Sequence, residues 1–105
     1  MNNNSDISLD LLYQAILCLE TKEECAEFFN DLCTPLELRS ISQRLLVAKL
    51  LGEGKVYSNI AAVTGASTAT ISRVNRTINS KYGGKGYEIV MDRLEELEWE
   101  SGTDE

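Results

Sequence analysis

Apolar residues return every three or four positions through most of the chain, which is the spacing of amphipathic helices. Cap and turn residues divide the pattern into six predicted helices, which begin near residues 9, 22, 35, 58, 68 and 87 and end near residues 19, 32, 51, 64, 80 and 99. The polar ends of the chain, residues 1–7 and 100–105, are predicted to fray. The pattern therefore predicts an all-α fold of six helices.

The starts of the second and third helices carry the signature of a capping box, in which a hydroxyl residue is followed three positions later by glutamate. Thr21 and Glu24 form one such pair. Thr34 and Glu37 form the other, with Pro35 at the first helical position. Both starts are therefore predicted from local sequence alone.

The first helix is apolar around most of its circumference. Its apolar side chains are Leu9, Leu12, Ile16 and Leu19 on one face, with Leu11, Tyr13 and Leu17 on a second. A helix of this kind has to be buried on several sides. Because a monomer of 105 residues with short helices offers too little cover, the pattern predicts a partner chain.

The stretch 57–76 reads as two helices joined by a tight turn, with Ser58 as the cap of the first. Small, glycine and branched apolar residues occupy offsets 0, 4 and 10, at Ala61, Gly65 and Ile71. Ala61 lets the helices cross closely, Gly65 permits a turn with positive φ, and Ile71 packs the second helix onto the first. The pocket between the helices is predicted to be filled by Ile60, Val63 and Val74. This spacing is typical of a DNA-binding helix-turn-helix, although ordinary helix pairs also use such residues.

Charge is distributed unevenly along the chain. The whole chain has a net charge of −7, which by itself argues against a nucleic-acid partner. Residues 34–86, however, hold eight Lys and Arg against two Glu, a net charge of +6, and the flanks hold two Lys and Arg against fifteen Asp and Glu. No Asp or Glu occurs from Ser58 to Ser80. The helix-turn-helix thus lies in the one part of the sequence that attracts phosphate.

A helical projection of residues 67–80 separates an apolar side from a polar side. Ile71, Val74 and Ile78 cluster on the apolar side, and Ala69, Ser72, Arg73, Arg76 and Ser80 lie opposite. Small side chains let a helix approach the floor of the major groove, and arginine binds guanine edges or phosphates. The candidate DNA-binding residues are Ser58, Asn59, Ser67, Thr68, Ala69, Thr70, Ser72, Arg73 and Arg76. Which arginine reads bases is left open, as is the operator sequence.

At 105 residues, 43% apolar and 26% charged, the chain has the size and balance of one folded domain. Histidine is absent, which removes the commonest metal ligand and the usual general base, so no metal, cofactor or enzymatic activity is expected. No apolar run is long enough to span a bilayer, and the amino terminus lacks the features of a secretion signal. A cytoplasmic protein is therefore expected, with Cys18, Cys25 and Cys33 reduced.

Two runs of sequence carry a resemblance to a known family. TPLELRSISQRLL begins at Thr34, and TGASTATISR ends at Arg73. Both resemble the Trp repressor superfamily, and the chain is most similar to its YerC/YecD-like branch. The resemblance implies an intertwined homodimer of six-helix chains whose first helices interlock. It also implies that the helix from Ser67 is the recognition helix of a transcription repressor, and that two copies bind operator half-sites in double-stranded DNA about one helical turn apart.

The resemblance carries over the family's co-repressor pocket in part. The matching positions are Thr34, Arg44, Thr70, Arg73 and Thr77, of which the two arginines would hold an indole and its carboxylate. Val74, however, replaces the glycine that lies against the ligand in tryptophan-binding members, and its side chain would fill part of that space. This substitution argues against tryptophan as a co-repressor, with Arg44 and Arg73 then contacting phosphates or carboxylates. A different small-molecule effector is left open.

A second hypothesis belongs to another class of function. In it the helix-turn-helix is only a scaffold, and the protein is a non-catalytic interaction module whose acidic flanks bind a basic partner. The absence of carboxylates from Ser58 to Ser80 favours DNA, because a merely solvated helix face in so acidic a chain would carry some.

Overall fold

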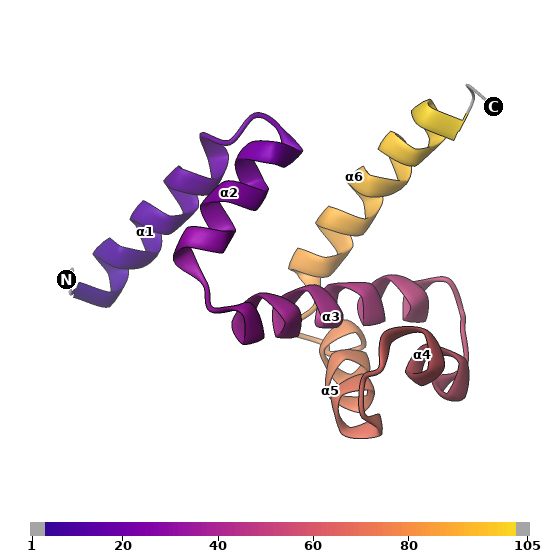
Figure 1. The fold of residues 1–105 in the computed structure, drawn as a ribbon. Coiled ribbons are helices and arrows are strands. Elements are labelled where there is room, and N and C mark those ends of the chain that lie inside the picture. Colours follow the sequence, from indigo (N-terminus) through magenta and orange to yellow (C-terminus); the bar gives the residue numbers. More distant parts are fainter. Residues whose placement is uncertain (1–3, 103–105) are drawn as a thin grey trace. The chain divides into compact units, whose positions relative to one another are not determined.

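Six helices and no strand make up residues 4–102, the part of the chain that this computed structural model describes (Figure 1). The helices are α1 (Asn4–Leu17), α2 (Lys22–Leu32), α3 (Pro35–Gly52), α4 (Tyr57–Thr64), α5 (Thr68–Ile78) and α6 (Lys85–Gly102). The predicted all-α, six-helix fold is confirmed. The chain divides into an N-terminal unit, Met1–Arg39, and a C-terminal unit, Ser40–Glu105. Its organisation as a single domain stays a prediction.

Both predicted helix starts are confirmed in the N-terminal unit. The reciprocal bonds of a capping box form at Thr34, whereas at the other start Glu24 Oε1 accepts from the Glu20 N–H at 2.8 Å. Thr21 Oγ1 accepts a hydrogen bond of 3.0 Å from the Glu24 N–H, and α2 begins at the next residue after Thr21. Thr34 Oγ1 accepts from the Glu37 N–H at 3.1 Å, while Glu37 Oε1 accepts from the Thr34 N–H at 2.9 Å. These bonds satisfy N–H groups that the first turn of a helix leaves free, so each start is fixed within a few residues of sequence.

The N-terminal unit has no buried side chain among residues 6–39. In α1, Leu11 is 67% exposed and Leu17 is 84% exposed. In α2, Phe28 and Phe29 meet edge to face with ring centroids 5.4 Å apart, yet both rings stay half-buried. Within the N-terminal unit, the face of Leu11, Tyr13 and Leu17 is therefore exposed, whereas Leu12 and Leu19 on the other face are half-buried.

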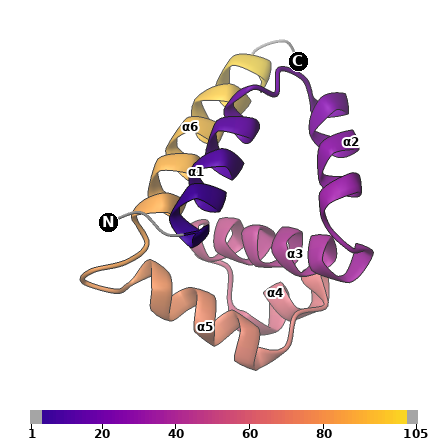
Figure 2. The same cartoon turned by 90° about the vertical axis from the view of Figure 1, so that its left-hand side faces the viewer.

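The C-terminal unit is built around one apolar core. Its buried residues are Val47, Ala48, Ile60, Ala66, Ile71 and Val74, with Leu50, Leu51, Ala61, Ile78, Tyr87 and Met91 packed against them. α3, α4 and α5 supply most of these side chains, and α4 and α5 lie on the same side of α3 in both views (Figure 1, Figure 2). The core therefore holds the pair α4 and α5 against the end of α3.

α6 turns a different face to this core than the sequence pattern predicts. The residues predicted to turn inward are Ile89, Val90, Leu94 and Leu97. Of these four, Leu94 is half-buried and the others are exposed. Tyr87 and Met91 pack against the core instead, because residues four apart lie on the same side of a helix and these two define the side that meets α5 and α3. The prediction for the inward face of α6 is therefore right for Leu94, which lies on the same side as Tyr87 and Met91, and wrong for Ile89, Val90 and Leu97.

α1 begins at Asn4 rather than near Leu9 and ends at Leu17 rather than near Leu19. The start of α4 also differs from the prediction. The helix begins at Tyr57, and its N-cap is Val56 rather than Ser58. Val56 is already extended, with φ −83° and ψ 159°, and its carbonyl accepts the first helical hydrogen bond from Ile60 at 3.0 Å. No side chain caps this end. Ser58 thus lies inside the first turn.

The remaining boundaries differ by a few residues. α5 ends at Ile78 rather than near Ser80. α6 begins at Lys85, two residues before the predicted start, because Gly86 lies in its first turn, where a glycine destabilises a helix little. Residues 4–7 are helical, so the predicted frayed start is wrong for them. The carboxylate of Asp6 in the first turn stabilises this end of the helix, which carries the positive end of the helix dipole. α6 likewise continues through residues 100–102. The other residues predicted to fray, 1–3 and 103–105, lie outside the described part.

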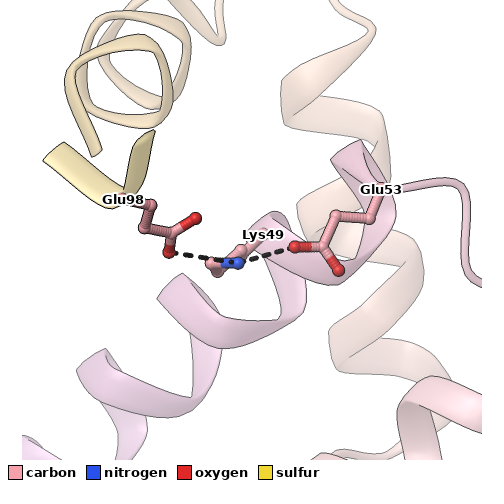
Figure 3. Close-up of polar contacts among 3 residues, drawn as sticks. All are labelled: Lys49, Glu53 and Glu98. Carbon is pink, nitrogen blue, oxygen red and sulfur yellow. Dashed lines mark hydrogen bonds and ion pairs between the residues drawn. The ribbon is translucent and has the colours of Figure 1, made fainter. Parts of the chain in front are cut away.

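Lys49 joins the end of α3 to α6 within the C-terminal unit (Figure 3). Its Nζ lies 2.6 Å from Glu53 Oε2 and 3.5 Å from Glu98 Oε2. The hydrogen bond with Glu53 raises the pKa of Lys49 and lowers the pKa of the Glu53 carboxyl. Because all three side chains are open to solvent, these pairs contribute little stability, and of the two the pair with Glu98 reaches α6.

Gly84 is the point at which the chain turns from α5 into α6. Its φ is +84°, and a Cβ there would lie 2.7 Å from the Thr77 carbonyl oxygen and 3.0 Å from the Ile78 carbonyl oxygen. Both the dihedral angle and the available space therefore require glycine. This close approach fixes the start of α6 against the end of α5.

Replacement of Gly84 by alanine is expected to lower the free energy of unfolding by about 2 to 3 kcal/mol, because the new methyl group meets two backbone carbonyls in a left-handed conformation. Gly86→Ala is the matched control, since no heavy atom lies within 4 Å of its Cβ position and alanine is favoured in a helix. Urea denaturation followed by circular dichroism measures both variants. Equal stability of Gly84→Ala and the wild-type protein would contradict the account.

Candidate nucleic-acid interface

The turn between α4 and α5 has the geometry that the sequence predicts. Gly65 adopts the left-handed conformation, with φ 74° and ψ 6°, and its N–H donates to the Ala61 carbonyl at 2.9 Å. No heavy atom lies within 4 Å of its Cβ position, so glycine is required here by the dihedral angle rather than by space. Ala61 itself packs against the core. The small residue and the glycine of the motif thus have the predicted roles.

The inner side of α5 is held by complete burial. Ile71 is 0% exposed and Val74 is 2% exposed, and both belong to one cluster with Ile60 of α4 and Val47 of α3. Full burial of a branched apolar side chain stabilises a fold by about 1.5 to 3 kcal/mol. The rotation of α5 about its own axis is therefore fixed by these contacts.

Val63 does not fill the pocket between the two helices, which corrects the sequence prediction. Its side chain is 60% exposed. The next residue, Thr64, is half-buried instead, and its hydroxyl donates to the Ile60 carbonyl at 2.8 Å and accepts from the Ala66 N–H at 3.0 Å. A step of one residue turns a helical side chain by about 100°, which explains the exchange between these neighbours.

Two hydroxyl groups shape the beginning of α5. Ser67 is the N-cap, and its Oγ accepts from the Thr70 N–H at 3.1 Å and donates to Thr70 Oγ1 at 3.1 Å. Ser67 and Thr70 therefore serve the helix start, which leaves Thr68 and Ala69 as the freely exposed residues of the first turn. No carboxylate occurs in that turn.

Most of the candidate DNA-binding residues are accessible. Ser58, Asn59, Ser67, Thr68, Ala69, Arg73 and Arg76 are exposed, and Thr70 and Ser72 are half-buried. Ala69, Arg73 and Arg76 lie at the centre of the outer side of α5, opposite Ile71 and Val74. Neither arginine forms an ion pair with any described residue. The outer side thus offers two available positive charges beside a small side chain; that these residues bind DNA stays a prediction.

Gln43 is a structural residue of this site that the sequence analysis does not identify. Its side-chain Nε2, on α3, donates to the Thr64 carbonyl at 3.1 Å, and this contact is partly buried. The two residues are 21 positions apart. A bond from a glutamine to a distant backbone carbonyl leaves no pattern in the sequence, so no local signal could have revealed it.

The predicted co-repressor residues lie in three places. Thr34 belongs to the N-terminal unit, where its hydroxyl caps α3. Thr70, Arg73 and Thr77 share one strip of α5, and the Thr77 hydroxyl donates to the Arg73 carbonyl at 3.2 Å. Arg44 is exposed on α3. A co-repressor pocket made by these residues stays a prediction.

An open pocket of about 700 Å³ lies elsewhere in the C-terminal unit. It is bordered by the end of α3, the turn after α5 and the start of α6, and it includes none of the predicted co-repressor residues. Its rim mixes cations such as Lys81 and Lys85 with carboxylates such as Glu88 and Asp92. This mixture gives no preference for a ligand of either charge.

Other kinds of site find little support in the described part of the chain. No group of three or more His, Cys, Asp or Glu side chains there is arranged to hold a metal ion. Cys18, Cys25 and Cys33 are free thiols. None of the helices, as far as their described residues reach, is both long and apolar enough to cross a bilayer.

Comparison with known proteins identifies the family. The family model "Trp repressor protein" matches residues 7–95. The chain belongs to the Trp repressor family. A Bacillus subtilis (strain 168) protein, the uncharacterized YerC, is 53% identical over 95 residues, which are 90% of this chain and 89% of that protein. The resemblance to the Trp repressor superfamily and its YerC-like branch is therefore confirmed.

Solved structures agree with this assignment. A TrpR-like protein from Eubacterium eligens ATCC 27750 is 53% identical and superposes with a TM-score of 0.77, covering 83% of this chain and 88% of that one. A crystal structure from Staphylococcus aureus is 49% identical, with a TM-score of 0.79 over 85% of this chain and 87% of that one. The chain thus has the fold of a family of DNA-binding regulators that are not enzymes.

Proposed function

We propose that this member of the Trp repressor family is a sequence-specific DNA-binding transcription regulator, acting in the cytoplasm as a homodimeric repressor. The observation that carries the proposal is the outer side of α5. It presents small side chains and two arginines without ion-pair partners among the described residues. No Asp or Glu occurs from Ser58 to Ser80, although the chain as a whole carries 17 of them. Such a surface is suited to a polyanion.

The proposed mechanism divides the work between the two helices of the motif. α5 enters the major groove with its first turn, where Thr68 and Ala69 are exposed and small enough to approach base edges. Arg73, about one turn further along, and Arg76, about two turns further along, bind guanine edges or phosphates. Ser58 and Asn59, in the first turn of α4, lie where the first helix of such a motif crosses the DNA backbone.

The homodimer is part of the proposal because the single chain leaves apolar helix faces uncovered. α1 exposes Leu11 and Leu17, and α6 exposes Ile89, Val90 and Leu97. A second copy that interlocks its α1 with these faces would bury them, as the family resemblance implies. Two recognition helices related by a two-fold axis would then read half-sites about one helical turn apart.

We infer further that tryptophan is not the co-repressor. Val74, at the position of a glycine in tryptophan-binding members, is 2% exposed and packs with Ile60 and Ile71. An isopropyl group anchored in the core at this position does not move aside for a ligand without opening a cavity.

Arg73→Ala and Arg76→Ala are expected to weaken binding by about 1 to 3 kcal/mol if the arginine bonds a base edge, because a bidentate guanine contact is lost. If the arginine contacts a phosphate instead, its replacement by alanine is expected to reduce the magnitude of the slope of log K against log salt by about 1. The measurement is fluorescence anisotropy on the duplex that the wild-type protein enriches from a random pool. Arg93→Ala on α6 is the matched control, and wild-type affinity for both α5 variants would refute the mechanism.

The dimer is tested by one charged substitution in α1. Leu11 is 67% exposed in the single chain, so Leu11→Glu is harmless to a monomer, whereas it places a carboxylate in the core of the proposed dimer. In analytical ultracentrifugation the wild-type protein is expected to show a dimer with twice the chain mass of 11.7 kDa. The Leu11→Glu variant is expected to lose this dimer. A wild-type monomer at micromolar concentration, or an unchanged Leu11→Glu dimer, would show that α1 does not form the interface.

Titration of tryptophan into the purified protein tests the co-repressor inference. A flat calorimetric trace at millimolar ligand is expected, because an isopropyl group stands at the position where tryptophan-binding members have a glycine against the ligand. Saturable heat in this range would overturn that inference. It would leave the DNA-binding proposal intact, because that proposal depends on the outer side of α5.

A further inference from the structure

One polar side chain connects the α3 scaffold to the turn of the helix-turn-helix. Gln43 Nε2 donates to the Thr64 carbonyl oxygen at 3.1 Å, in a partly buried position. Thr64 is the last residue of α4, and the last carbonyls of a helix have no partner within the helix. Gln43 therefore satisfies an acceptor at the point where the chain leaves α4.

Thr64 is also the centre of the hydrogen bonds that shape the turn. Its hydroxyl donates to the Ile60 carbonyl at 2.8 Å and accepts from the Ala66 N–H at 3.0 Å. The N-cap of α5, Ser67, follows immediately after Ala66. The Thr64 carbonyl is thus connected to the first turn of α5 by a short segment in which the N–H groups of Gly65 and Ala66 are hydrogen-bonded.

The apolar core holds the chain on either side of that first turn, but the turn itself makes no buried contact. Ala66, before the N-cap, is 5% exposed and Ile71 is 0% exposed, whereas Thr68 and Ala69 between them are exposed. Thr68 lies about 4 to 5 Å along the helix axis from Ile71, at a rise of about 1.5 Å per residue. Because the side chain of Ala66 is a single methyl group, the hydrogen bond from Gln43 to the Thr64 carbonyl adds the directional constraint on this segment.

We propose that Gln43 is a positioning residue for base reading, which rests on the proposed function of α5 in DNA binding. By holding the turn against α3, it sets the direction in which Thr68 and Ala69 point. Contacts to base edges tolerate little displacement, whereas long arginine side chains follow a phosphate that has moved. Gln43 therefore controls discrimination between operator and other DNA rather than affinity for DNA as such.

The test compares Gln43→Met with the wild-type protein on two duplexes, the one enriched from a random pool and a scrambled sequence, at one salt concentration. Methionine keeps the length and apolar stem of glutamine but cannot donate a hydrogen bond. Gln43→Met is expected to bind the enriched duplex about fivefold more weakly, the scale of one lost hydrogen bond. Affinity for the scrambled duplex, and the salt dependence, are expected to stay unchanged.

Asn79→Met is the matched control, because Asn79 Nδ2 also donates a hydrogen bond to a backbone carbonyl, at 2.9 Å to Asn75, just after the far end of α5. It is expected to leave both affinities unchanged. A second readout uses no DNA: hydrogen exchange at the Ala66 N–H, which is bonded to Thr64 Oγ1, is expected to speed up in Gln43→Met by a larger factor than exchange at the buried Ile71, because the lost bond loosens the turn before the core.

Three results separate the failures. If the wild-type protein enriches no duplex, the proposed function fails, and the role of Gln43 in base reading fails with it. If the wild-type protein discriminates and Gln43→Met discriminates equally well, the proposed function stands and the positioning role is overturned. If Gln43→Met weakens both duplexes by the same factor, or exchange at Ala66 is unchanged, Gln43 does not act through the turn and the inference is also overturned.

Discussion

Burial of Ile71 and Val74 against Ile60 and Val47 is the constraint on which the rest of the site depends. A short helix with exposed polar residues has little stability of its own, so packing of one side decides both that α5 forms and how it is rotated. Once that side is buried, helical geometry places Ala69, Arg73 and Arg76 opposite, facing solvent. The chemistry available to a ligand therefore follows from the identity of the buried residues as much as from that of the exposed ones.

Charge separation gives this exposed side its character. The chain carries a net charge of −7, but its carboxylates are concentrated outside the motif, with none between Glu53 and Glu88. Interactions between exposed charges are screened beyond about 8 to 10 Å in physiological salt, so a bound phosphate responds to the local cations rather than to the total charge. A net negative charge is thus consistent with DNA binding by the outer side of α5. The acidic flanks of the chain disfavour indiscriminate contact with nucleic acid.

The features that the sequence predicts correctly are those that a few neighbouring residues determine. The capping box of Thr34 and Glu37 closes within four residues, and the left-handed turn at Gly65 depends on that residue's own dihedral angles. The features that it misses depend on contacts between distant segments. Helical periodicity alone does not distinguish Val63 from Thr64 as the inward residue, and it does not show that Tyr87 and Met91 meet the core. The bond from Gln43 to Thr64 and the approach of Gly84 to Thr77 likewise require the folded chain.

The central claim, that the outer side of α5 faces DNA, is tested most directly by photo-crosslinking. A benzophenone amino acid is placed at Ala69, on the outer side of α5, or at Asp92, an exposed position on α6. Irradiation with the duplex that the wild-type protein enriches from a random pool is predicted to link position 69 to bases of that duplex. Position 92 is predicted to give no crosslinked product. Crosslinks from position 92 without any from position 69 would contradict the account.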